Sequence, residues 1–116
     1  MRTWMVALVG VALCSAVIGA QTPDPAKVKA GEALYVKIKC STCHAIKGEG
    51  GKLSTDLSGI SAKMSEADIK TWISKPETME PKLPKKPVMP MSTYMKTQKI
   101  TDADVDALVA YVRSLK

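Results

Sequence analysis

The chain has 116 residues, enough for one small domain, and its formal net charge is +6 at pH 7. With three Tyr, two Trp and no Phe, aromatic side chains do not interleave with the basic residues as they do in nucleic-acid-binding domains, so that class is disfavoured. A domain of this size struggles to bury enough apolar area by itself, which favours a cofactor in its core.

Residues 1–20 are predicted to be a secretory signal peptide that precedes the domain. Arg2 provides a positive start, and residues 5–18 form an apolar run without charge. This run is short for a membrane span, although an uncleaved anchor is the alternative interpretation. We therefore expect residues 21–116 to form an exported domain that does not contact the membrane after cleavage.

The first helix of the domain is expected from Pro25 to about Lys39. Asp24 is a favourable N-cap, and Pro25 suits the first helical position. Gly31 costs such a helix roughly 1 kcal/mol relative to Ala. Simple tolerance is one explanation for this glycine, and close approach by the last helix is the other.

The segment Cys40-Ser41-Thr42-Cys43-His44 follows this helix and has the spacing of a c-type haem attachment site. Each thiol would form a thioether with one haem vinyl group, and the short turn between the cysteines lets both reach neighbouring vinyls. His44 would then be the proximal ligand of the iron. The segment therefore predicts haem c, and with it iron, as the cofactor.

Three other uses of two cysteines at this spacing fit the sequence less well. A thioredoxin-like redox pair usually follows a strand, and no β-branched run precedes Cys40. A structural zinc site needs four ligands, whereas residues 21–116 offer only Cys40, Cys43 and His44 as thiol or imidazole ligands. A structural disulfide would not explain the adjacent histidine.

An irregular loop is expected after the motif, because Gly48, Gly50 and Gly51 follow one another closely. Leu57 and Ile60 come next and are expected to pack against a face of the haem.

A second helix is expected from Ser65, which resembles the start of a capping box. Ile69, Trp72 and Ile73 then form one apolar stripe, and Pro76 ends the helix. Trp72 is interpreted either as a core residue or as a residue whose indole N–H meets a haem propionate.

Residues 77–100 lack periodicity and carry four prolines and four methionines, so we expect a long functional loop. One methionine is the natural sixth ligand of the iron, and the others fill gaps in the core or are exposed. Between Lys75 and Lys99 there are six lysines against two glutamates. This excess is either a solvated face or a docking surface for an acidic redox partner.

The last helix is expected to begin at Thr101, with acidic residues in its first turn. Its apolar side chains recur with helical spacing at Val105, Leu108, Val109 and Val112.

Taken together, these segments make the chain similar to a small bacterial class I cytochrome c. The resemblance covers essentially all of residues 21–116, and besides the cysteine motif it rests on residues 31–35, 56–57, 72–76, 89–90 and 107–112. It implies an all-α fold of three to four short helices and long loops wrapped around one covalently bound haem. In such a fold the first and last helices cross near-perpendicularly, with Gly31 and Tyr35 meeting the region of Tyr111.

The resemblance also implies His/Met ligation of the iron. Met89-Pro90 most resembles the family's ligand segment, and Met91 is the alternative; a second histidine ligand is not available, because the chain has one histidine. Members often have Gly-Pro shortly before the position of Leu57, and the proline carbonyl accepts the proximal histidine Nδ1–H. Thr55 stands there in this chain, so its carbonyl is expected to take that role. The expected haem contacts are Cys40, Cys43, His44, Met89, Trp72, Leu57 and Thr55.

These features predict a periplasmic electron carrier rather than an enzyme, because two filled axial positions leave the iron no room for substrate. Its expected partners are redox proteins, such as a dehydrogenase, a quinol-oxidising complex or a terminal oxidase, and it is expected to be a monomer. The alternative is a permanently bound haem c subunit of a periplasmic oxidoreductase complex. A gas-binding or peroxidatic haem would require that no methionine ligates.

Overall fold

The computed structural model describes residues 22–116, so the predicted signal peptide, residues 1–20, lies outside the described residues. The described part is mostly helical, as the sequence predicted, and none of its helices has the length and hydrophobicity needed to cross a membrane. Its helices are α1 (Pro25–Lys37), α2 (Glu66–Ser74), α3 (Pro76–Met79), α4 (Met91–Met95) and α5 (Asp102–Ser114). The strands are β1 (Ala45–Ile46) and β2 (Glu49–Gly50), and the 3₁₀ turns are η1 (Cys40–Thr42), η2 (Ile60–Ala62) and η3 (Glu80–Lys82).

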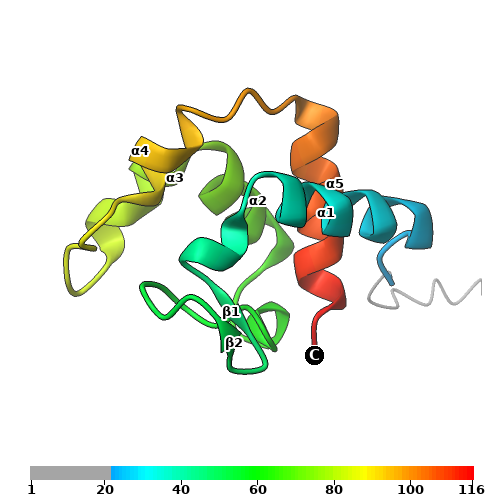
Figure 1. Cartoon of the computed structure of the whole chain (residues 1–116), viewed down its shortest axis with the longest axis horizontal. Coiled ribbons are helices and arrows are strands. Elements are labelled where there is room, and N and C mark those ends of the chain that lie inside the picture. Colours follow the sequence, from blue (N-terminus) through cyan, green and yellow to red (C-terminus); the bar gives the residue numbers. More distant parts are fainter. Residues whose placement is uncertain (1–21) are drawn as a thin grey trace, which may run out of the picture.

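Helices α1 and α5 pack across each other, and Gly31 lies at their contact (Figure 1). A Cβ on Gly31 would lie 2.0 Å from the Ala107 carbonyl oxygen and 2.7 Å from Tyr111 Cβ. Beside this contact the rings of Tyr35 and Tyr111 meet edge to face, with centroids 5.5 Å apart. The close approach predicted at Gly31 is confirmed, and it explains why a residue that disfavours helices stands within α1.

The hydrophobic core lies where α1, α2 and α5 meet. The side chains that form it come from all three helices and the residue after α1: Tyr35, Ile38, Ile69, Ile73, Val105, Leu108, Val109 and Val112. The apolar stripes predicted in the second and last helices therefore both face this core. Trp72, predicted in the same stripe of the second helix, is half-buried and is not one of these core residues.

The three helix starts predicted from the sequence are confirmed by their caps. The side-chain oxygens of Asp24, Ser65 and Thr101 each accept a hydrogen bond from a backbone N–H two or three residues on, at 2.9–3.2 Å. α1 ends at Lys37, two residues earlier than expected, and the chain turns at Lys39, which adopts a left-handed conformation with φ of 55°. This turn directs the next residues away from the axis of α1.

The irregular loop expected from Lys47 on is correct for residues 51–59 but wrong for residues 47–50, which belong to a short hairpin with Ala45 and Ile46. β1 and β2 pair antiparallel, with Ala45 opposite Gly50. The turn between them is Lys47-Gly48, where both residues have positive φ, 51° and 78°. Such a two-residue turn matches the twist of a hairpin, and Gly48 adopts it without strain.

Residues 77–100 also contain regular structure that the sequence did not indicate. Pro76 ends α2, as predicted, but it also occupies the first position of α3. α4 follows Pro90, and the segment between η3 and α4 remains irregular. The expected long loop is thus divided into two irregular stretches, residues 83–90 before α4 and residues 96–100 after it.

Candidate functional site

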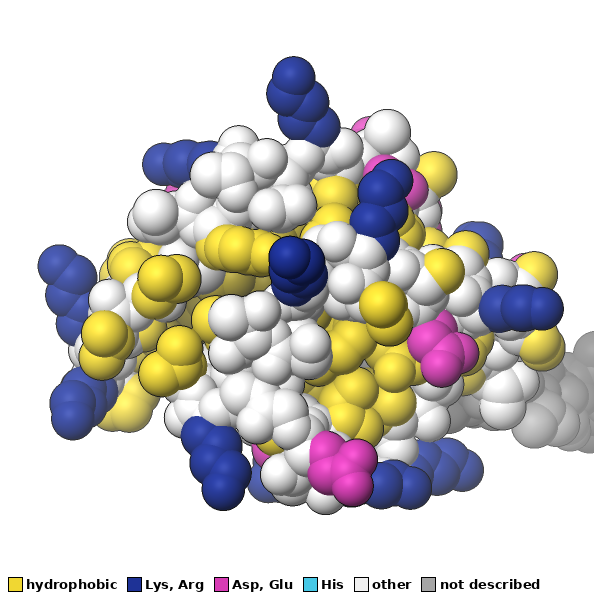
Figure 2. Space-filling model, in the orientation of Figure 1, with side chains coloured by type: hydrophobic (Ala, Val, Ile, Leu, Met, Phe, Trp, Pro, Cys, Tyr) yellow, Lys and Arg dark blue, Asp and Glu magenta, His cyan; other side chains and the backbone are white. Residues whose placement is uncertain are grey.

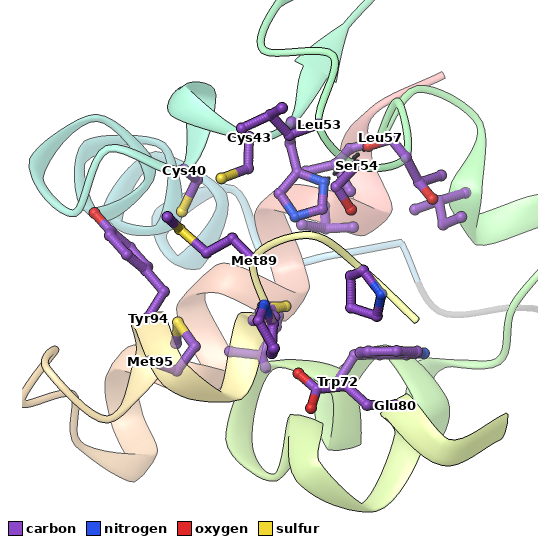
Figure 3. Close-up of a pocket in the computed structure, with 18 of the residues that line it drawn as sticks. Cys40, Cys43, Leu53, Ser54, Leu57, Trp72, Glu80, Met89, Tyr94 and Met95 are labelled. Carbon is purple, nitrogen blue, oxygen red and sulfur yellow. Dashed lines mark hydrogen bonds between the residues drawn. The ribbon is translucent and has the colours of Figure 1, made fainter. Parts of the chain in front are cut away.

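A cavity of about 240 Å³ lies between the cysteine motif, α2 and the irregular segment before α4. Every residue predicted to contact haem lines it: Cys40, Cys43, His44, Thr55, Leu57, Trp72 and Met89. Figure 3 shows Cys40 and Cys43 on one side of the open space, and Trp72 and Glu80 on the opposite side. The structure therefore brings together residues that lie up to 49 positions apart in the sequence.

The two cysteines are positioned by η1. The backbone N–H groups of Cys43 and His44 both donate to the Cys40 carbonyl, at 3.2 and 3.0 Å. This tight turn exposes both thiols to the cavity and places His44 directly beside them. Cys40 and Cys43, the two cysteines within residues 22–116, are both free thiols.

The chemistry of Cys40 differs from that of a reactive redox thiol. Burial, with a smaller contribution from Cys43, raises the pKa of the Cys40 thiol to about 11. Catalytic disulfide-exchange cysteines have a lowered pKa, because the thiolate is the nucleophile. The raised pKa therefore disfavours the thioredoxin-like alternative. The zinc alternative has no support either, because no three His, Cys, Asp or Glu side chains in the described part of the chain are arranged to hold a metal ion.

His44 has one ring nitrogen engaged and one free. Nδ1 lies 2.8 Å from the Thr55 carbonyl oxygen, and because a carbonyl only accepts, Nδ1 carries the proton. This is the contact expected for Thr55. Nε2 then has the lone pair and makes no hydrogen bond within residues 22–116, so it is the nitrogen available to a metal.

The segment that supplies Thr55 runs alongside the cysteine motif. Three backbone hydrogen bonds of 2.8–3.0 Å join the N–H groups of residues 51, 54 and 57 to the carbonyls of residues 41, 43 and 45. A Cβ on Gly51 would lie 2.2 Å from the Thr42 carbonyl oxygen, so glycine is needed for this approach. The ladder fixes the Thr55 carbonyl relative to His44.

Asp56 provides a second attachment for this segment. Its carboxylate accepts hydrogen bonds from the N–H groups of Gly48 and Ser58, both at 2.8 Å. Ser58 Oγ in turn accepts from the Lys47 N–H at 2.6 Å. The hydrogen bonds to its carboxylate lower the pKa of Asp56 below its ordinary value, and the bond from the Ser58 N–H contributes most. This role of Asp56 was not predicted, although an Asp in a loop often accepts a hydrogen bond from the backbone N–H two residues on.

The four candidate methionines are separated by the fold. Met89 lies in the irregular segment, lines the cavity and is 55 % exposed. Met91 is the first residue of α4 and Met95 the last, and both line the cavity and pack against the core. Met79 is buried and does not line the cavity; the Lys82 Nζ lies 3.8 Å from its sulfur. The structure leaves Met89, Met91 and Met95 beside the site.

Two further residues at the site were not anticipated from the sequence. Glu80 lines the cavity and accepts two hydrogen bonds from Ser92. The Tyr94 hydroxyl, also at the cavity, donates to the Ile38 carbonyl at the end of α1. Both contacts join residues distant in the sequence, and no local pattern signals them.

This donor set fits haem c. Two free thiols at the attachment spacing, an imidazole with a free Nε2 and a thioether sulfur surround one mostly apolar cavity. When the chain is compared with protein families, the cytochrome c family matches residues 28–116, which include the whole site. Comparisons with curated proteins and with solved structures give no match. The chain therefore belongs to the cytochrome c family, with a covalently bound haem c and its iron as the centre for electron transfer.

Proposed function

We propose that this cytochrome c is a periplasmic carrier of single electrons, with His44 and Met89 as the two axial ligands. Haem c supplies the one-electron Fe(III)/Fe(II) couple. The observation that carries the proposal is the convergence of both thiols, the free Nε2 of His44 and the Met89 sulfur on one cavity. His/Met ligation raises the reduction potential and leaves the iron without an open position for substrate.

The surroundings of the methionines support Met89 over Met91. Met91 is the first residue of α4 and already packs against the core. Met89 precedes Pro90 in the segment without regular structure, where its side chain is half-exposed and free of core contacts. Of the two, the Met89 sulfur is the one whose position is not already determined by core packing.

The surface beside Met89 supports transfer between proteins. Exposed apolar side chains, Leu53, Leu83, Val88 and Met89, lie at or near the cavity, and Lys82, Lys85 and Lys86 are exposed among them. Figure 2 shows hydrophobic side chains at the end of the molecule formed by residues 82–90, with lysine side chains projecting around it. The exposed apolar side chains provide a contact area for a partner protein, and the positive charge steers an acidic partner towards it.

The permanently bound subunit is the second candidate, because 96 % exposure of Val88 next to 55 % exposure of Met89 would also suit a lasting contact. The surrounding lysines favour the diffusing carrier, since charges around a docking site mainly accelerate the encounter of two proteins. Export to the periplasm is supported by the signal-peptide pattern of residues 1–20 and by covalent haem attachment, which bacteria carry out outside the cytoplasmic membrane.

Electron-transfer rates with the protein's own redox partner test this proposal. For a steered carrier the second-order rate falls several-fold between ~10 mM and ~200 mM salt, because the Debye length shrinks from about 30 Å to below 10 Å. Exchanging both Lys85 and Lys86 for Glu should slow the reaction similarly at low salt.

The matched control exchanges Lys27 and Lys29 for Glu, since both are exposed on α1 and do not line the cavity. This control should change the rate much less. Electron-transfer rates that change neither with salt concentration nor with either charge reversal would contradict the proposal that this surface is the docking site. Copurification of the cytochrome with an oxidoreductase in fixed proportion would instead support the subunit role.

A further inference from the structure

The segment that carries Met89 is fixed only at its ends. Residues 84–89 make no hydrogen bond with any part of residues 22–116. The last bond before them runs from the Leu83 N–H to the Glu80 carbonyl at 3.1 Å, and the first after them is accepted by the Pro90 carbonyl. The position of Met89 therefore depends on how firmly the two ends are joined.

Glu80 and Ser92 join these ends directly. The Ser92 backbone N–H donates to Glu80 Oε1, and the Ser92 hydroxyl donates to Glu80 Oε2, both at 2.8 Å. Ser92 is only 9 % exposed, so water competes poorly for these bonds. Hydrogen bonds to a carboxylate are stronger than those between neutral groups. We refer to this pair as the Glu80–Ser92 clamp.

Both sides of the clamp are anchored to the rest of the site. Glu80 directly follows α3, whose Pro76 and Met79 are buried. Ser92 belongs to α4, and Tyr94 of the same helix donates its hydroxyl hydrogen to the Ile38 carbonyl, two residues before Cys40. The clamp thus ties the Met89 segment to the same part of the chain that holds the two thiols.

We propose that the Glu80–Ser92 clamp holds the Met89 segment closed over the haem cavity, which makes Glu80 a positioning residue for the distal ligand. This inference rests on the proposed His44/Met89 ligation. With the clamp formed, the conformational-entropy cost of closing the segment is met when the protein folds and not when the sulfur binds the iron. The Met89 sulfur therefore stays near its binding position. Without the clamp, the segment opens more often, and an external ligand reaches the iron faster.

A purely electrostatic role for Glu80 makes a different prediction. Glu80 lines the cavity, so its charge alone would influence the reduction potential. That effect does not need Ser92. The clamp needs both residues, and their effects should therefore overlap rather than add.

The test measures how fast cyanide binds to the oxidised holoprotein, together with the far-red charge-transfer band of the sulfur–iron bond. The variants are Glu80→Ala, Ser92→Ala and the double variant. Glu77→Ala is the matched control, because it removes the same charge from an exposed side chain of α3 that makes no hydrogen bond within residues 22–116. Where Glu80→Ala does not accumulate with haem, Glu80→Gln replaces it.

We expect cyanide binding to accelerate roughly ten- to a hundredfold in Glu80→Ala and less in Ser92→Ala, which keeps its backbone donor. The double variant should behave like Glu80→Ala, and Glu77→Ala like the wild type. Cyanide binding at the wild-type rate in both single variants, or additive effects of the two substitutions on that rate, would contradict the clamp. If the wild type still shows the sulfur–iron band, His/Met ligation would stand. A wild type without the band would contradict the proposed ligation itself, and with it the clamp.

Discussion

The two segments that face the cavity are fixed in different ways. The proximal segment, residues 40–58, is joined by a backbone ladder, by the Thr55 contact to His44 and by the Asp56 carboxylate. The distal segment, residues 80–92, depends on two hydrogen bonds to one carboxylate, Glu80. The proximal segment can lose one hydrogen bond and still be held by the others. The distal segment has few hydrogen bonds that could replace a lost one.

This difference indicates where the site can change its ligands. The thioethers and His44 belong to the segment with distributed support, and we expect them to stay in place in both redox states. Met89, the proposed distal ligand, belongs to residues 84–89, which make no hydrogen bond within residues 22–116, so exchange of iron ligands should begin there. The following predictions test this asymmetry, starting with the largest effect.

Replacing Cys40 or Cys43 with Ala should have the largest effect. Each thiol forms one of the two bonds that make the haem permanent, so either change should abolish or severely reduce haem-containing protein. Haem staining of denatured protein measures this directly. Cys14→Ala, which changes the cysteine of the predicted signal peptide, is the control and should leave haem attachment unchanged. Normal covalent haem in both single variants would contradict the assigned attachment site.

Replacing Met89 with Ala should affect the distal side alone. We expect loss of the far-red sulfur–iron band, a lower reduction potential and binding of small ligands to the iron, while the haem stays covalently attached. Met91→Ala is the matched control, because Met91 also lines the cavity and packs against the core. It should cost stability but keep the band. The opposite pattern would transfer the ligand role to Met91.

Replacing Asp56 with Asn should give the smallest effect, on the proximal side. Asn keeps an oxygen for the Ser58 N–H but places an NH₂ group against the Gly48 N–H, so the segment loses one attachment. We expect a lower denaturation midpoint at pH 7 and an unchanged rate of cyanide binding. Asp68→Asn, in the first turn of α2, is the control for the change in charge. A large rise in the rate of cyanide binding would contradict the claim that only the distal segment controls access to the iron.

The pH dependence of this effect follows from the lowered pKa of Asp56. Since the folded pKa lies below the ordinary value of 3.8, the ionised carboxylate stabilises the fold above that value. The stabilisation is lost as the pH falls through the lowered pKa. The difference between wild type and Asp56→Asn should therefore narrow below about pH 4, as urea unfolding at a series of pH values would measure.

The parts of the fold that the sequence predicted depend on local signals. Asp24, Ser65 and Thr101 cap the helices that follow them, because a capping side chain acts within three residues. The spacing of Cys40 and Cys43 likewise sets the geometry of attachment within one turn. Gly31 was noticed in the sequence because glycine destabilises a helix. Glycine is needed there because a Cβ would collide with the carbonyl oxygen of Ala107.

The parts that the sequence did not predict depend on contacts across the fold or on unusual backbone conformations. Glu80 and Ser92 are separated by an irregular segment, and nothing near either residue indicates the other. The hydrogen bond from Tyr94 to Ile38 spans 56 positions. The hairpin at residues 45–50 was missed because Lys47 adopts a positive φ that few non-glycine residues adopt.

The absorption spectrum of the purified wild-type protein, recorded before and after acid–acetone extraction, tests the central claim most directly. A haem held by Cys40 and Cys43 and ligated by His44 and a methionine should remain with the protein after extraction. The oxidised protein should also show the weak far-red band of a sulfur–iron bond. Haem that moves into the acetone phase would contradict covalent attachment, and retained haem without the band would contradict methionine ligation.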